Sequence, residues 1–247
     1  MRRKARSRGG TLVVGTGGIG AGVIYRLEGN GTLGREESRP AERMPGRDFC
    51  KLHIILHYVA RLLPELGVRA RVCPVGAVGS DPEGREMRKL MRAEGMDLGL
   101  VRTIRNCRTL FSVCFQYPSG EGGNLTEKRG ASRLVCAGHV GRAESRLKSA
   151  GARAIVLAAP EVPLAARHRL LALGRRHGAF NTASFVADEM RGLKAAQLRR
   201  IDLLSVNREE AAALAGASAR GRASSAVRYC LKKLSAAGAD GGLGVTC

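Results

Sequence analysis

Tryptophan is absent from the 247 residues, and phenylalanine and tyrosine together make up only 4% of the chain. Acidic side chains are also scarce: 21 aspartates and glutamates stand against 42 lysines and arginines, so the formal charge is +21. Such a charge suits a nucleic acid or an anionic membrane. However, the basic residues are scattered through almost every segment, and no aromatic stacking platform lies among them. The composition therefore argues against nucleic acid as the main partner and leaves a nucleic-acid binder as a third option.

Several familiar motifs are missing as well. The seven cysteines are odd in number and contain no C-x-x-C pair, which supports neither a zinc ribbon nor a disulfide framework and favours a reducing cytoplasm. No G-x-x-x-x-G-K-[ST] segment occurs, so P-loop chemistry is excluded. Glycines interrupt the apolar run near the N-terminus, and no other run reaches membrane-spanning length. We expect a soluble, cytoplasmic protein with no membrane partner.

The patterns that are present alternate between strands and helices. After a disordered basic tip at residues 1–10, the apolar run at 11–15 predicts a buried strand, followed by a Gly-rich turn region to about residue 45. A helix is predicted at 48–66, then a strand at 71–79 and a second helix that Asp81 caps, with Pro82 in its first turn. Segment 108–135 has β-rich flanks around a Gly-rich turn, which predicts a hairpin beside the main sheet.

From residue 152 onward the alternation is regular. The predicted strands and helices are 152–159, 162–178, 179–184, 193–200, 201–206, 208–216, 223–238 and 243–247. Parallel neighbours need crossover helices, so we predict one α/β domain at 11–247 with a mostly parallel sheet covered on both faces. The pattern stops on a strand at Cys247 with no helix after it, so we expect a domain that lacks its C-terminal part and exposes apolar sheet surface, which favours instability or association.

A glycine-rich stretch near the N-terminus raises the alternative of a dinucleotide-binding dehydrogenase. Residues Gly15 to Gly20 match G-x-G-x-x-G. The motif requires a helix that opens at its last glycine, and the sequence that follows breaks within ten residues. We therefore do not favour a Rossmann fold.

Two histidines offer a weak metal signal. His53 and His57 are four residues apart and lie on one face of the predicted helix, where they could provide two metal ligands. The sequence indicates no third ligand, so we favour half-buried histidines that line the helix over a metal site.

Asn207 and Glu210 give a stronger signal. A predicted strand runs directly into them, and ligands of open α/β sheets bind at the carboxyl ends of strands. Asn207 is also a good helix N-cap, which is the simpler explanation. The spacing of three residues places an amide beside a carboxylate, a pair suited to hold a hydrated Mg²⁺ near phosphates.

At these residues the chain resembles the ribokinase-like, or PfkB, family of carbohydrate kinases, from about Leu12 to the last residue. The segment at 75–102 is similar to the family's G-x-x-G-x-D-x-x-G segment, and the segment at 202–216 to its N-x-x-E segment. The matching positions are Gly76, Gly79, Asp81, Gly84, Asn207 and Glu210. The resemblance also matches Glu161 to a glutamate near the sugar, Asn181 to an asparagine near the phosphates and Thr246 to a threonine near the nucleotide.

The resemblance implies a ribokinase-like fold with a small β lid around 108–135. It implies transfer of the γ-phosphoryl group of ATP to a hydroxyl of a sugar, nucleoside or similar small alcohol, assisted by Mg²⁺. By the same resemblance Asn181, Asn207, Glu210 and Thr246 would serve the nucleotide, with Glu210 on the metal, and two copies would form a homodimer through the lid.

The chain departs from the family pattern in three places. The early Gly-Gly-x-x-x-Asn segment has no glycine pair here, and Asp48, Lys51 and His53 are the candidates to replace it. The aspartate usual after the first strand falls near Ile19 and is missing. The Gly-Ala-Gly-Asp segment that supplies an anion hole and the catalytic base is absent, and we expect it beyond Cys247.

These departures lead to one predicted function and one alternative. We predict a carbohydrate kinase in which Asp48 and Glu161 bind substrate, with this chain impaired because the segment carrying the base is absent. The alternative is a protein of the same fold that binds a sugar or nucleotide without catalysis.

Overall fold

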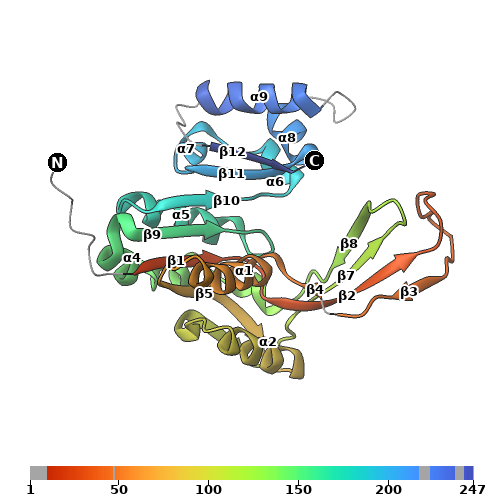
Figure 1. Cartoon of the computed structure of the whole chain (residues 1–247), viewed down its shortest axis with the longest axis horizontal. Coiled ribbons are helices and arrows are strands. Elements are labelled where there is room, and N and C mark those ends of the chain that lie inside the picture. The colour runs from red at the N-terminus through yellow and green to blue at the C-terminus, as the bar shows by residue number, and fades with distance from the viewer. Residues whose placement is uncertain (1–9, 47, 217–222, 237–241, 247) are drawn as a thin grey trace.

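The main sheet of the computed structural model is parallel throughout (Figure 1). The structure describes residues 10–46, 48–216, 223–236 and 242–246. In spatial order the seven strands are β12 (Gly242–Thr246), β11 (Leu203–Asn207), β10 (Phe180–Ala183), β9 (Ala154–Ala158), β1 (Thr11–Thr16), β5 (Ala70–Gly79) and β6 (Val101–Ile104). Every pairing between these neighbours is parallel, which confirms the predicted sheet.

Helices lie on both faces of this sheet. The helices are α1 (Lys51–Glu65), α2 (Pro82–Ala93), α3 (Ala137–Gly141), α4 (Glu144–Ala150), α5 (Leu164–Arg176), α6 (Ala187–Arg191), α7 (Ala195–Leu198), α8 (Arg208–Ala215) and α9 (Ala223–Ala236). Their cover is incomplete: on the face that α1 and α2 occupy over β1 and β5, strands β10 and β11 expose Phe180 and Ser205. Short 3₁₀ turns lie at Leu98–Leu100, Ala131–Leu134 and Gly151–Arg153. No helix of the described residues is long and apolar enough to cross a membrane.

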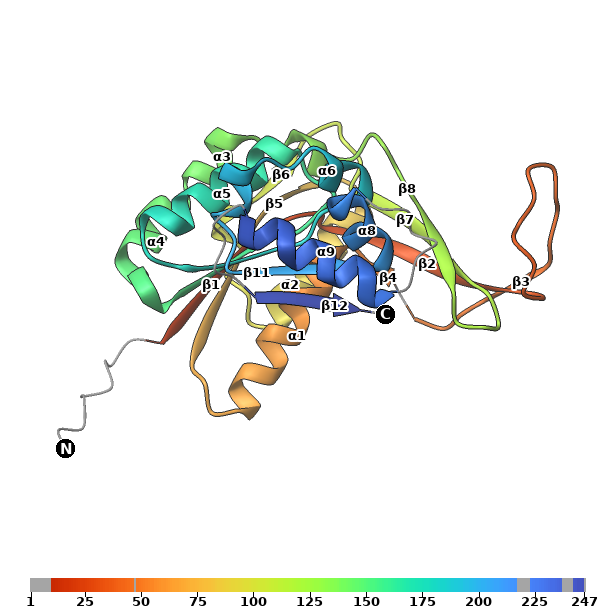
Figure 2. The ribbon, with the colours of Figure 1, turned by 90° about the horizontal axis from the view of Figure 1, so that it is seen from above.

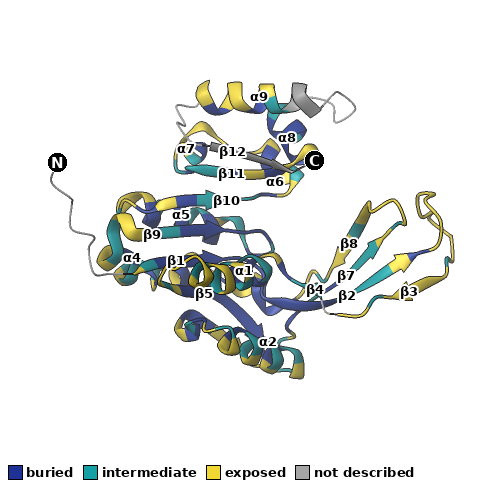
Figure 3. Ribbon diagram, in the orientation of Figure 1, coloured by how far each residue is buried: buried dark blue, intermediate teal, exposed yellow. Residues whose placement is uncertain are grey.

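Strand alternation divides the apolar residues between two cores. Val13 of β1 faces α1 and α2, where it packs with Leu52 and Met87, whereas the next residue, Val14, belongs to the core that α5 closes with Leu170. Most residues of β1, β5 and β9 are buried (Figure 3), which explains why β1 and β9 read as unbroken apolar runs in the sequence.

A second sheet projects from the carboxyl ends of the main strands (Figure 2). Its strands are β3 (Ala41–Arg43), β2 (Gly20–Leu27), β7 (Leu110–Gln116), β8 (Gly122–Thr126) and the short β4 (Asp48–Phe49), which pairs with β2. We call this five-stranded sheet the lid. Strands β7 and β8 form a hairpin within 108–135, and β2 lies beside β7.

The lid corrects one sequence-based expectation and agrees with another. Residues 20–27 were expected to be a Gly-rich turn and instead form β2, the lid strand that pairs with β3, β4 and β7. Gly20 opens that strand rather than a helix, which agrees with our rejection of a dinucleotide-binding motif. The glycines are needed for close packing: a Cβ on Gly20 would lie 2.2 Å from the carbonyl oxygen of Leu110.

The turn after β5 anchors the base of the lid to α2. Asp81 caps α2 by accepting a hydrogen bond from Gly84 N–H at 3.0 Å, and its other carboxylate oxygen accepts one from Thr109 N–H at 2.7 Å. Pro82 occupies the first helical position as predicted. A Cβ on Gly79 would lie 2.2 Å from the carbonyl oxygen of Cys107, so this turn fits closely against the segment that enters β7. The glycine and aspartate spacing thus positions the lid.

Candidate active site

A cavity of about 980 Å³ lies between the lid and the carboxyl ends of β9 and β10. The lid contributes residues of β7 and β8, including Cys114 and Asn124. The floor is the segment after β9, with Glu161, and the N-terminus of α1, with Lys51. This is the edge where open α/β sheets bind ligands, and the size suits a small metabolite.

Glu161 lines this cavity in an unusual backbone conformation. Its φ is +74°, a region that non-glycine residues seldom adopt and that is often found at binding sites. The carboxylate accepts a hydrogen bond from Lys51 N–H at 3.0 Å. It also lies against the turn between β1 and β2, where a Cβ on Gly18 would come within 2.2 Å of its Oε2 atom. Gly18 therefore makes room for this carboxylate.

The environment of Glu161 raises the pKa of its carboxyl group. Burial raises the pKa of Glu161, the hydrogen bond from Lys51 N–H and the charge of Lys51 lower it, and the nearby charge of Asp48 raises it again. The net shift is upward. Two carboxyl groups thus lie close together in a partly desolvated part of the site. Sugar hydroxyls could stabilise both groups by donating hydrogen bonds to them.

Asp48 reaches this part of the site across strand β2. It lies opposite Gly22 in the register, and its Oδ2 atom accepts hydrogen bonds from the Ser112 hydroxyl at 2.8 Å and the Cys114 thiol at 3.0 Å. A Cβ on Gly22 would lie 2.9 Å from the same oxygen, so glycine is required there. Burial first, and then Asp48, raises the pKa of the Cys114 thiol to about 12, which keeps it a hydrogen-bond donor.

Asn207 and Glu210 meet at the carboxyl end of β11. The Asn207 side chain accepts a hydrogen bond from Glu210 N–H at 2.8 Å, and Glu210 Oε2 accepts one from Asn207 N–H at 2.9 Å. This is a complete capping box on α8, with Asn207 exposed and Glu210 only 8% exposed. In the register Asn207 is paired with Thr246 of β12, whose side chain lies outside the described residues.

Asn181 does not fit the role expected from the sequence. It is the second residue of β10, near the amino end of that strand, and its exposure is 0%. Its side-chain amide donates to the carbonyls of Leu171 and Arg200 at 2.8 and 2.7 Å. We correct the assignment to a structural one, because a completely buried amide that joins α5 to the segment before β11 cannot also contact phosphate.

The histidines of α1 also lie away from the cavity. His53 is fully buried with its Nε2 atom 3.2 Å from Glu94, and His57 Nδ1 lies 2.8 Å from the same carboxylate. Burial lowers the pKa of His53, and Glu94 opposes that shift. His53 is therefore not a replacement for the missing sugar anchor, and no group of three potential metal ligands occurs in the part of the chain that the structure describes.

Sequence reasoning missed four residues at this site. Gly18 and Gly22 admit the two carboxylates, while Ser112 and Cys114 hold Asp48 in place. A weak signal was present, since Ser112 and Cys114 alternate on one face of a strand that carries apolar residues on the other. Their partner could not be named without the pairing of β2 with both β4 and β7.

The raised pKa of Glu161 predicts a specific dependence of stability on pH. The folded state binds this proton more tightly than the unfolded state, so the contribution of Glu161 is most favourable at low pH and declines as pH rises through the raised pKa. We expect Glu161→Gln to become progressively more stable relative to the unmodified protein between pH 4 and 8, as measured by urea unfolding.

Glu127→Gln provides the matched control, because Glu127 lies on the rim of the same cavity with its side chain 38% exposed. Its stability difference from the unmodified protein should stay nearly constant over the range. A Glu161→Gln difference that does not change with pH would contradict the electrostatic account of this part of the site.

The pfkB family carbohydrate kinase model matches residues 58–241, well over half of the chain. No curated protein matches the chain. Among solved structures, the ribokinase from Giardia lamblia superposes with a TM-score of 0.71 at 14% identity, over 96% of this chain and 70% of that one.

Two further structures agree. The Arabidopsis thaliana ribokinase complexed with ribose and ATP has a TM-score of 0.63 at 18% identity, over 96% of this chain and 72% of that one. A carbohydrate kinase from Agrobacterium tumefaciens has a TM-score of 0.60 at 20% identity, over 96% and 70%. At these identities the structures establish the ribokinase-like fold, and the family model matches most of the chain. The chain belongs to the PfkB family of carbohydrate kinases.

Proposed function

We propose that this protein binds a sugar or related small alcohol beneath its lid for phosphorylation by ATP. The observation that carries the proposal is the pair of neighbouring carboxylates Asp48 and Glu161, of which Glu161 lines the cavity, in a chain of a carbohydrate kinase family. The six described cysteines are free thiols, which supports the proposal that the protein is located in the reducing cytoplasm.

The substrate side would act by positioning. Carboxylates accept hydrogen bonds from vicinal sugar hydroxyls, and such bonds are strong in a corner that water reaches poorly. Asp48 is already oriented by Ser112 and Cys114, and Glu161 by Lys51 N–H, so binding would cost little rearrangement. Closure of the lid would exclude water from the phosphoryl group, which otherwise could be transferred to water.

The nucleotide side would lie at the carboxyl ends of β11 and β12. Asn207, Glu210 and Thr246 are the residues of this chain proposed for it. A hydrated Mg²⁺ fits here, because it needs few protein ligands and Glu210 provides a nearly buried carboxylate beside a helix N-terminus. When bound, the ion would neutralise charge on the phosphates of ATP.

No residue of this chain is assigned as the catalytic base. The sequence contains no Gly-Ala-Gly-Asp segment, and loss of a general base typically costs on the order of 10²–10⁴ in rate. We therefore propose that the 247 residues bind substrate but transfer phosphate slowly. A non-catalytic sugar-binding or nucleotide-binding protein is the alternative.

A direct assay tests this function. ADP formation from Mg²⁺-ATP should be stimulated by one member of a panel of sugars and nucleosides, and Asp48→Asn should weaken binding of that compound about tenfold by removing a charged acceptor. Asp188→Asn on α6, whose side chain is 90% exposed, is the matched control and should have no effect. Binding without any stimulated ADP formation would favour the alternative, and a panel with no binding at all would refute both.

Glu210→Gln separates a metal role from a capping role. Glutamine keeps the side-chain oxygen that the capping box needs but removes the charge that would attract Mg²⁺. We expect an unchanged melting temperature and at least about tenfold weaker binding of Mg²⁺-ATP, with binding of metal-free ATP unaffected. Unchanged Mg²⁺-ATP affinity, measured by calorimetry, would show that Glu210 only caps α8.

We also propose that two copies associate through the lid. On the face opposite Ser112 and Cys114, Val113 pairs with Val23 on one side and Leu125 on the other. Leu125 is 68% exposed, so this apolar row is open for a second copy.

Leu125→Asp tests this association. It should convert a dimer to a monomer in light scattering, whereas Leu66→Asp, at a leucine of similar exposure (74%) on the C-cap of α1, should not. If the unmodified protein stays monomeric over a 100-fold range of concentration, association through the lid is ruled out.

A further inference from the structure

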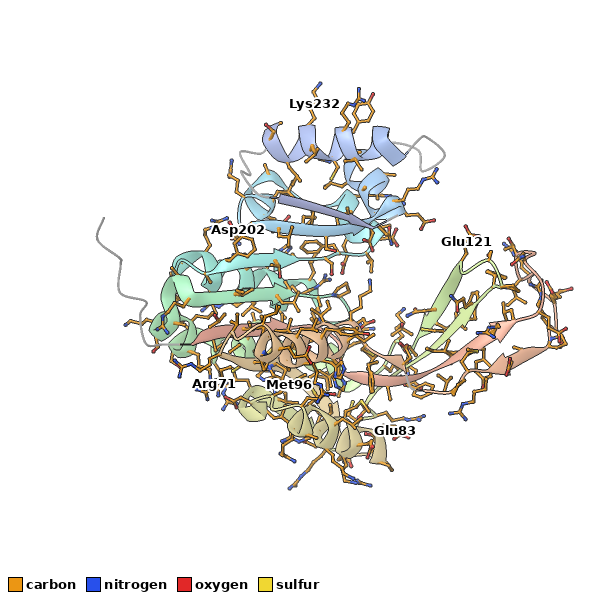
Figure 4. The ribbon with its side chains drawn as sticks, viewed as in Figure 1. Arg71, Glu83, Met96, Glu121, Asp202 and Lys232 are labelled. Atoms are coloured by element: carbon orange, nitrogen blue, oxygen red, sulfur yellow. The ribbon has the colours of Figure 1, made fainter. Side chains whose placement is uncertain are left out.

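A second cavity, of about 510 Å³, lies at the end of the main sheet where its strands begin, opposite the candidate active site. It is formed by the amino ends of β1 and β5 together with α4 and the turn before β9. Figure 4 shows Arg71 at this end of the molecule, far from Glu121 at the tip of the lid. Four arginines line the cavity: Arg69, Arg71, Arg146 and Arg153.

Little negative charge compensates these arginines. Asp97 accepts hydrogen bonds from Arg71 Nε and from Gly99 N–H, both at 2.9 Å, and Arg146 lies 2.9 Å from the same carboxylate. Although burial opposes it, the Gly99 and Arg71 hydrogen bonds hold the pKa of Asp97 below its usual range. Asp97 is therefore ionised and already occupied by two guanidinium groups.

The other two arginines have no acidic partner among the described residues. Arg153 donates to the carbonyls of Gly10 and Ser149, both at 3.3 Å, and no ion pair is formed by Arg69 or Arg153 in that part of the chain. Ser145 and Ser149 add two hydroxyl groups to the lining. The cavity thus gathers four guanidinium groups against one saturated carboxylate, which disfavours its empty state and attracts a multivalent anion.

The composition of the lining identifies the class of ligand. Guanidinium groups match phosphate oxygens in bidentate geometry, and serine hydroxyls donate to the same oxygens. No aromatic residue lines this cavity to stack a base. A cavity of about 510 Å³ has the size of a small-molecule site.

We propose that this cavity is a second ligand site, separate from the candidate active site, that binds a small phosphorylated molecule through Arg69, Arg71, Arg146 and Arg153. It lies at the amino ends of the strands, whereas the sugar and nucleotide would bind at the carboxyl ends. The proposal does not depend on kinase activity.

Pyrophosphate is the probe, titrated into the full chain by calorimetry in EDTA so that no divalent metal supports binding at the nucleotide side. Chloride keeps the ionic strength constant. We expect saturable binding to the unmodified protein and at least about tenfold weaker binding to the double variant Arg69→Ala/Arg153→Ala. Both side chains are exposed, so the variant should fold, and its melting temperature without ligand verifies this.

Two controls locate the binding. Arg43→Ala removes an exposed arginine from the lid, and Lys128→Ala removes a cation from the cavity under the lid. Both should bind pyrophosphate as the unmodified protein does. The proposal is overturned if pyrophosphate fails to bind, if the double variant binds it equally well, or if Lys128→Ala weakens binding as much. A single-stranded oligonucleotide that binds far more tightly than pyrophosphate through the same arginines would also overturn it.

Discussion

The carboxylate of Glu161 joins the three parts of the molecule that make the candidate site. It extends from the carboxyl end of β9, packs against the turn between β1 and the lid, and accepts the hydrogen bond of Lys51 N–H at the start of α1. A positive φ and a glycine at position 18 are both needed for this placement. This acidic group therefore contacts the main sheet, the start of the lid and α1 together, and its burial among them works against its ionisation.

The same region explains why the lid begins so close to the sheet. Gly20 and Gly22 let β2 pass within contact distance of β7 and of Asp48, so that a carboxylate on one side of β2 is held by a hydroxyl and a thiol on the other. Larger side chains at these positions would separate the strands and release Asp48. Residues that look like a flexible glycine-rich turn in the sequence are thus a rigid part of the binding corner.

The sequence predicted much of the main sheet, because strands buried on both faces leave unbroken apolar runs such as residues 154–158. It failed for β2, whose glycines carry no strand signal. It placed Asn207 and Glu210 correctly at a strand's end, since a capping box is a local pattern. It misplaced Asn181, because the position of a residue within a short strand depends on where that strand begins. The four arginines of the second cavity were unrecognisable as a group, because residues 69–71 and 146–153 meet only through the pairing of β1 with β5 and β9.

The two ends of the main strands carry different charged groups: carboxylates lie near the carboxyl ends, under the lid, and arginines lie at the amino ends. The most direct test of the sugar assignment is a crystal structure with ribose and a non-hydrolysable ATP analogue. The account predicts sugar hydroxyls within hydrogen-bond distance of both Asp48 and Glu161, with the lid in contact with the ligand. A sugar bound elsewhere, or bound beneath the lid without contact to either carboxylate, would contradict it.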